Sequence, residues 1–217
     1  YYKLLRRYSF RLFLRDVIRF RDELSIEKLT HYCSTTKAQR YLDALADLGI
    51  VARTGRNGRY EFRGNPQVRS FGDTLEWFVA QTFVREFRIP ACWGISVADL
   101  REGGDFDVIG VLASSRLVYV ETKASPPKNL HMDVVEGFVR RVTHLAPDLA
   151  ILLVDTHLRM EDKINKMARA ALGERTGRDH RKETVQIARG VFRLAPGIYT
   201  CNSKPAIHKN LRCCIRD

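Results

Sequence analysis

The chain has 217 residues, enough for one large domain or two small ones. With 45% hydrophobic and 29% charged residues it resembles an ordinary globular protein, and no apolar run approaches the roughly 18 residues of a membrane span. Five scattered cysteines argue against a disulfide framework. They favour a reducing intracellular compartment, which we expect to be a cytoplasm of prokaryotic type.

The net charge of +12 points to a polyanionic partner such as nucleic acid. This charge is unevenly spread along the chain. Residues 1–66 carry a net +7 and residues 172–217 a net +6, whereas residues 67–171 carry a net −1. A metal-dependent nuclease would have this distribution, because it needs carboxylates at its centre and phosphate-binding cations around them.

Three helices are predicted before residue 50. Residues 8–22 have the amphipathic spacing of a helix, with arginines interleaved among apolar residues. Ser25 is a suitable N-cap for a short second helix over residues 26–33. Residues 37–48 form the third helix, and Gly49 stands where a helix commonly ends on a glycine.

A β-hairpin is predicted directly after the third helix. Residues 50–54 and 60–62 read as strands, and Asn57-Gly58 between them supplies the positive φ angles of a tight turn. Three helices followed by a hairpin is the order of a winged helix-turn-helix domain. The Gly64-Asn65-Pro66 stretch then marks a boundary, so we expect domains at 1–66 and 67–217.

The first domain carries candidate DNA contacts at two places. The start of the third helix would present polar and basic side chains to the major groove, namely Thr35, Thr36, Lys37 and Arg40. Arginines that could hold backbone phosphate surround the hairpin turn, namely Arg53, Arg56, Arg59 and Arg63. A winged helix can also serve protein contacts, but these arginines favour DNA.

The second domain is predicted to alternate strands and helices around a central sheet, which is an α/β arrangement. The expected helices cover residues 74–88, 132–145 and 161–172. The expected strands cover residues 106–112, 116–123, 149–154, 184–194 and 198–202. Residues 149–154 are continuously apolar, which favours a strand covered on both faces.

Two features near the end of the chain allow several interpretations. Residues 173–182 form a basic polar stretch, predicted as a loop that either clamps a nucleic-acid backbone or is simply solvated. Cysteines and a histidine follow at spacings that match no common zinc site, namely Cys201, His208, Cys213 and Cys214.

Carboxylates and a lysine gather at the ends of two predicted strands. Alternation along the strand places Glu121 and Lys123 on one face, and a hairpin partner strand can bring Asp107 beside them. Hard carboxylate oxygens on neighbouring strands suit Mg²⁺ or Mn²⁺. A nearby ammonium group can orient water or offset charge on a phosphate in its transition state. Glu121 and Lys123 could alternatively form a surface ion pair, but the pattern favours the metal site.

This pattern resembles the PD-(D/E)xK nuclease superfamily, also called restriction-endonuclease-like. Its motif is an acid, a variable spacer and then acid-x-lysine at a strand end, here Asp107 and Glu121-Thr122-Lys123. Glu76 occupies the position of an additional acid that the family often has on the preceding helix. The resemblance covers roughly residues 70–155. Phe106 replaces the usual proline before the first acid, and Asp105 is an alternative to Asp107 as a ligand.

The resemblance implies a fold and a reaction. The fold would be a restriction-endonuclease-like mixed sheet flanked by helices, following the winged helix-turn-helix domain. Asp107, Glu121 and Glu76 would bind Mg²⁺ or Mn²⁺, and Lys123 would assist the attacking water, so all four are candidate catalytic residues. The expected function is a DNA-binding, metal-dependent endonuclease that hydrolyses phosphodiester bonds, either restriction-like or DNA-processing. The partner is DNA, no membrane is expected, and RNA as substrate or a homodimer stays open.

Two other functions remain. The chain could be a non-catalytic DNA-binding regulator with a degenerate nuclease fold, or a protein-interaction module. The intact set of Asp107, Glu121 and Lys123 favours the nuclease over the regulator. The basic hairpin makes the interaction module the weakest of the three.

Overall fold

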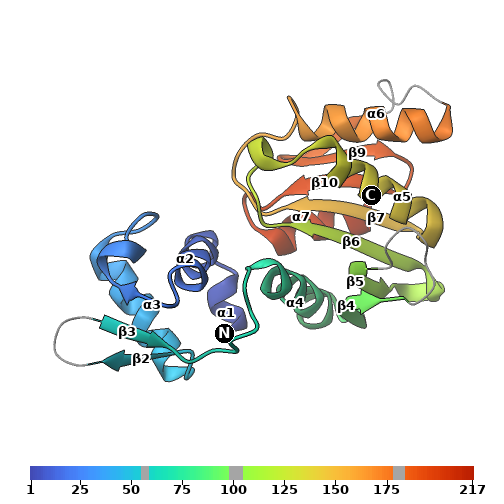
Figure 1. Cartoon of the computed structure of the whole chain (residues 1–217). Coiled ribbons are helices and arrows are strands. Elements are labelled where there is room, and N and C mark those ends of the chain that lie inside the picture. Colours follow the sequence, from blue (N-terminus) through green and yellow to red (C-terminus); the bar gives the residue numbers. More distant parts are fainter. Residues whose placement is uncertain (55–58, 98–104, 178–183) are drawn as a thin grey trace. The chain divides into compact units, whose positions relative to one another are not determined.

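The computed structural model describes residues 1–54, 59–97, 105–177 and 184–217 (Figure 1). The chain forms two compact units, Tyr1–Asp73 and Thr74–Asp217. The division lies seven residues after Pro66 because the intervening segment is held by the first unit. Nη1 of Arg21 donates to the carbonyl oxygens of Pro66 and Val68, at 3.0 and 2.8 Å. Among the described residues, no helix is long and apolar enough to cross a membrane.

Helices of the first unit bury an aromatic core. They are α1 (Tyr2–Leu5), α2 (Tyr8–Arg19) and α3 (Thr35–Asp47), with the 3₁₀ turn η1 (Glu27–Leu29) before α3. Phe10 and Phe13 of α2 pack on Tyr41 of α3, with ring centroids 5.0 and 5.2 Å apart. The apolar face of each helix is therefore buried against the other, as its periodicity requires.

A three-stranded antiparallel sheet completes the first unit. Its strands are β1 (Leu24–Ser25), β2 (Val51–Thr54) and β3 (Arg59–Phe62), in the order β1-β3-β2. The predicted second helix over residues 26–33 is wrong, since only the 3₁₀ turn forms. Ser25 pairs with Arg59 in the sheet, so Ile26 rather than Ser25 precedes that turn. At α3 the side chain of Ser34 caps the helix by accepting from the backbone N–H of Lys37.

The second unit is an α/β structure with a seven-stranded mixed sheet in the order β4-β5-β6-β7-β10-β9-β8. The strands are β4 (Ala91–Ser96), β5 (Asp105–Val111), β6 (Leu117–Lys123), β7 (Leu149–Val154), β8 (Val185–Ala188), β9 (Val191–Ala195) and β10 (Ile198–Asn202). The helices are α4 (Gly72–Thr82), which continues as the π-helical turn η2 (Phe83–Phe87), α5 (Met132–Leu145), α6 (Ile164–Thr176) and α7 (Ile207–Arg216). Short 3₁₀ turns stand before β6 and α5, at Ala113–Ser115 and Pro127–Asn129.

Three parallel strands, β6, β7 and β10, form the centre of this sheet. Every residue of β7 is buried, as its continuous apolar sequence predicts. Alternate β7 residues share one core cluster with Phe138 of α5 and Ala168 of α6. In Figure 1, α5 and α6 cover this face and α7 lies across the other. The cluster fixes α5 over β6, which positions the candidate site.

Several element boundaries differ from expectation. The sequence did not predict α1, β1, β4 or α7. Strand β4 is mostly exposed and lacks apolar alternation. The predicted strand 184–194 is a hairpin, β8 and β9, that turns at Gly190. Helix α6 runs to Thr176, so the first residues of the predicted loop 173–182 are helical, and residues 178–182 lie outside the described residues.

Candidate active site

The hairpin of β5 and β6 brings Asp107 beside the end of β6. The antiparallel register pairs Val108 with Val120, so the next residues outward are Asp107 and Glu121. Oδ2 of Asp107 accepts from the backbone N–H of Thr122 at 2.7 Å and from its hydroxyl at 3.2 Å. These bonds hold the Asp107 carboxylate against β6, as the strand pattern predicted for this residue.

Glu121 is fully buried and both of its carboxylate oxygens have partners. Its Oε1 lies 2.7 Å from Nζ of Lys123 and 2.7 Å from Nη2 of Arg141. Its Oε2 accepts from Nε of Arg141 at 3.1 Å and from the hydroxyl of Tyr119. A buried carboxylate is costly without partners, and here two cations and a phenol supply them.

The pKa values of the two carboxyl groups, Asp107 and Glu121, are shifted in opposite directions. Burial, with the charge of Glu121, raises the pKa of Asp107 to about 6, although its Thr122 hydrogen bonds act against this. Burial also raises the pKa of Glu121, but Lys123 and Arg141 outweigh it and keep that pKa below its usual value. Burial and the Glu121 charge raise the pKa of the Tyr119 phenol, so it keeps its proton and donates.

Asp107 and Glu121 could supply carboxylate oxygens to a hard divalent cation. Among the described residues, no three acidic, histidine or cysteine side chains lie close enough to hold one ion together. Mg²⁺ needs no such group, because one or two carboxylates, waters and substrate phosphate commonly complete its shell. Within the described part of the chain, no hydrogen bond reaches Oδ1 of Asp107. Burial and the charge of Glu121 raise the pKa of Asp107, and a bound cation would offset both effects.

The two other candidate acids, Glu76 and Asp105, lie on α4 and β5. A Cβ added to Gly94 would stand 3.9 Å from Oε2 of Glu76. Gly94 lies in β4 between the partners of Val108 and Phe106, so Glu76 sits one strand away from Asp107. Asp105 is exposed at the start of β5. A direct role for Glu76 at the metal stays a prediction.

Sequence reasoning missed Arg141 and Tyr119, the remaining partners of Glu121. Helical spacing offered a signal for Arg141. It falls on the apolar stripe of α5 that contains Val134, Phe138 and Leu145, where a charge requires a buried partner. Tyr119 stands two residues before Glu121 on β6 and therefore shares its face.

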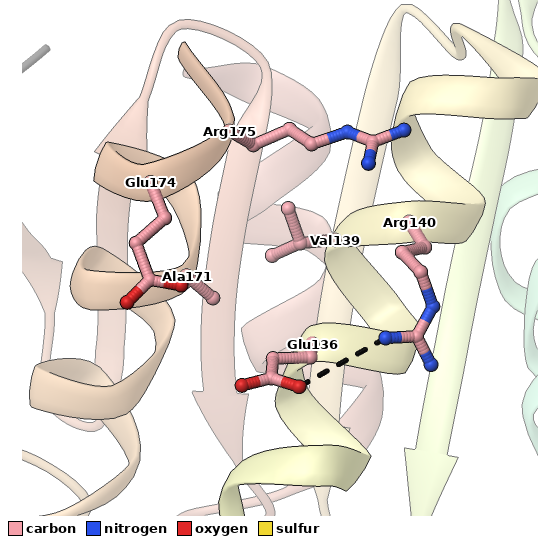
Figure 2. A pocket seen from close by; sticks show the side chains of 6 residues that line it. All are labelled: Glu136, Val139, Arg140, Ala171, Glu174 and Arg175. Carbon is pink, nitrogen blue, oxygen red and sulfur yellow. Dashed lines mark ion pairs between the residues drawn. The ribbon is translucent and has the colours of Figure 1, made fainter. Parts of the chain in front are cut away.

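A pocket of about 270 Å³ between α5 and α6 is separate from this site. Figure 2 shows its lining, which is Glu136, Val139, Arg140, Ala171, Glu174 and Arg175. Arg140 pairs with Glu136 across 3.9 Å, whereas Arg141, the next residue, turns to Glu121. The adjacent residues Arg140 and Arg141 of α5 therefore pair with different acids, Glu136 and Glu121.

The candidate DNA contacts of the first unit are solvent-accessible where they are described. On α3, the four predicted side chains are exposed, namely Thr35, Thr36, Lys37 and Arg40. Arg53 and Arg63 are exposed in ion pairs with Asp43 at 2.8 Å and Glu61 at 3.3 Å. Arg59 is exposed, and Arg56 lies outside the described residues.

Comparisons with protein-family models, with curated protein sequences and with solved structures gave no significant match to this chain.

Proposed function

We propose that this chain is a DNA-binding, divalent-metal-dependent endonuclease. The observation that carries the proposal is the cluster of Asp107, Glu121 and Lys123 at the adjoining ends of β5 and β6. A buried and a half-buried carboxylate with an ammonium group at one strand end form a donor set suited to metal-assisted phosphodiester hydrolysis. The order of α2, the 3₁₀ turn η1, α3 and the β2–β3 hairpin in the first unit supports DNA as the polymer that is bound.

Asp107 and Glu121 would hold Mg²⁺ or Mn²⁺, which would polarise the phosphate and make a bound water more acidic. The water oxygen would form the new bond to phosphorus, and the bond from phosphorus to the leaving sugar oxygen would break. Lys123 is the more exposed of the two cations beside Glu121, with 28% of its side chain accessible against 22% for Arg141. Its ammonium group would orient the water or neutralise a phosphate oxygen as negative charge accumulates.

Cleavage of supercoiled and linear DNA by the full chain tests this proposal. We expect nicking or cutting that requires Mg²⁺ or Mn²⁺ and stops in EDTA. Asp107→Ala and Lys123→Ala should each abolish cleavage while the circular dichroism spectrum stays that of a folded protein. Asp105→Ala, which changes an exposed acid two residues from Asp107, should leave most of the activity.

One observation favours a second candidate function, a non-catalytic DNA-binding regulator. Glu121 already has two cations and a phenol around its oxygens, and an acid so well paired can be purely structural. A chain that binds DNA but cuts no DNA or RNA substrate with any divalent metal would support the regulator. In that case Asp107→Ala would leave DNA affinity unchanged in the presence of Mn²⁺.

A further inference from the structure

Glu121 has two cationic partners that differ in how they are attached. Both Nζ of Lys123 and Nη2 of Arg141 lie 2.7 Å from the same oxygen, Oε1. Lys123 contacts Glu121 through this one atom. Arg141 also donates from Nε to Oε2 at 3.1 Å and to the hydroxyl of Tyr119 at 2.9 Å. The arginine therefore grips both carboxylate oxygens, and the lysine only one.

This difference decides which cation can leave. A bidentate guanidinium fixes the orientation of a carboxylate, whereas an ammonium group on a flexible stem is a point charge that can move. Gly137 lies one turn before Arg141 on α5. A Cβ on Gly137 would be in ordinary van der Waals contact with the two terminal nitrogens of that guanidinium, at 3.6 and 3.7 Å.

We infer that Arg141 is a positioning residue that holds Glu121 in place when a divalent cation binds, and that Lys123 is the partner displaced from Oε1. The inference rests on the metal site of the proposed function. Binding of the cation would displace the Lys123 ammonium group from Oε1. The ammonium group could then face water or phosphate. Arg141 stays on both oxygens, so departure of Lys123 would leave one side of Oε1 for the cation.

Mn²⁺ affinity of the full chain, measured from the electron paramagnetic resonance signal of free Mn²⁺, tests this role. Lys123→Ala and Arg141→Gln each remove one positive charge at 2.7 Å from Oε1. If only charge matters, both variants bind Mn²⁺ more tightly than the wild type. The inference instead predicts opposite signs: tighter binding in Lys123→Ala, and about 10–100-fold weaker binding in Arg141→Gln, the usual loss when a residue supporting a metal ligand is removed.

Two further variants separate position from charge and from misfolding. Arg141→Lys keeps the charge but cannot grip both oxygens, so its Mn²⁺ affinity should fall between those of the wild type and Arg141→Gln. Arg140→Gln removes the neighbouring arginine, which faces Glu136, and should leave Mn²⁺ affinity near the wild-type value. Thermal unfolding of each variant shows that the affinities refer to folded protein.

The outcomes distinguish this inference from the proposed function. Tighter binding in both Arg141→Gln and Lys123→Ala, or unchanged binding in Arg141→Lys, would overturn the positioning role while leaving the metal site intact. If Asp107→Ala binds Mn²⁺ as well as the wild type does, the metal site itself is wrong, and the role of Arg141 falls with it.

Discussion

Asp107 carries a conflict between stability and the proposed reaction. Its carboxyl group has a pKa of about 6, raised by burial and by the charge of Glu121, so the folded chain binds this proton more tightly than the unfolded chain does. The contribution of Asp107 to stability therefore improves as pH falls from about 6 toward its unfolded pKa near 4. Above pH 6 the ionised carboxylate opposes folding unless a cation is bound.

Asp107→Asn should consequently stabilise the metal-free protein. The asparagine oxygen can still accept from Thr122, while the repulsion with Glu121 disappears. We expect a gain of up to about 3 kcal/mol in the free energy of unfolding at pH 8, shrinking toward zero at pH 4. Urea unfolding in EDTA at several pH values measures it. Asp105→Asn on the same strand is the control and should change little, and a destabilised Asp107→Asn would contradict this reading.

At the residue scale, the sequence identified the motif residues more readily than the side chains that contact them. Asp107, Glu121 and Lys123 could be identified because strand alternation and hairpin pairing are local rules. The partners of Glu121 could not be found in the same way. Arg141 comes from α5, twenty residues after Glu121, and its reach depends on how that helix crosses β6. The spacing of residues along the sequence does not predict where or at what angle α5 crosses β6.

Among the secondary-structure elements, helix α5 contains a glycine, Gly137, in its interior. Glycine in a helix interior costs about 1 kcal/mol relative to alanine. An alanine Cβ would be in ordinary van der Waals contact with Arg140 and Arg141, at 3.6 to 3.8 Å. Gly137→Ala should therefore stabilise the protein by up to about 1 kcal/mol with Mn²⁺ affinity retained.

A larger side chain at the same position supplies the contrast. Gly137→Leu should extend into the space that the Arg141 guanidinium occupies and separate it from Glu121. Mn²⁺ affinity should then fall as it does in Arg141→Gln, while Gly137→Ala binds normally. Urea unfolding and Mn²⁺ titration of the two variants check this. Equal Mn²⁺ affinity in both would show that Arg141 does not need this space.

Elements with strong periodicity were predictable, and those set by tertiary contacts were not. The predicted helix over 132–145 and strand over 149–154 match α5 and β7 at both ends, because their apolar patterns are unambiguous. The predicted helix over 26–33 failed because Ser25 is drawn into pairing with Arg59, a partner thirty-four residues away. Strand β4 is held by its pairing with β5, which its own sequence does not signal.

For the molecule as a whole, we expect the first unit to supply much of the DNA affinity. Residues 1–66 carry a net +7, whereas residues 67–171 carry a net −1 and repel phosphate in the absence of metal. Each phosphate that is neutralised releases counterions, so affinity should fall steeply with salt. A fragment of residues 74–217 that bound DNA as tightly as the full chain would contradict this division of labour.

Arg59 and Arg53 provide a matched pair within the hairpin. Arg59 is exposed and forms no ion pair among the described residues, whereas Arg53 is paired with Asp43. Arg59→Ala should weaken binding to all DNA sequences alike and reduce the salt slope by about 1. Arg53→Ala should have the smaller effect. Fluorescence anisotropy over a salt series measures both slopes, and a sequence-dependent loss in Arg59→Ala would indicate base contact instead.

Lys37 and Arg40 on α3 should behave differently if they reach base edges. Replacing either with alanine would cost about 1–3 kcal/mol of binding free energy and relax preference at one position. Selection of bound sequences from a random DNA library would show the lost preference. A uniform loss across all sequences would place both residues at the phosphate backbone.

The position of β10 in the sheet delays folding of the second unit during translation. The contacts of the first unit are closed by residue 73. In the second unit β10 lies between β7 and β9, although it is the last strand of the chain. During translation one edge of β7 therefore has no partner strand until residue 202 has left the ribosome, and that apolar edge is exposed until then. The first unit can be finished while the carboxylate site still lacks a closed sheet, so under the proposed function nascent chains would acquire DNA affinity before cleavage activity.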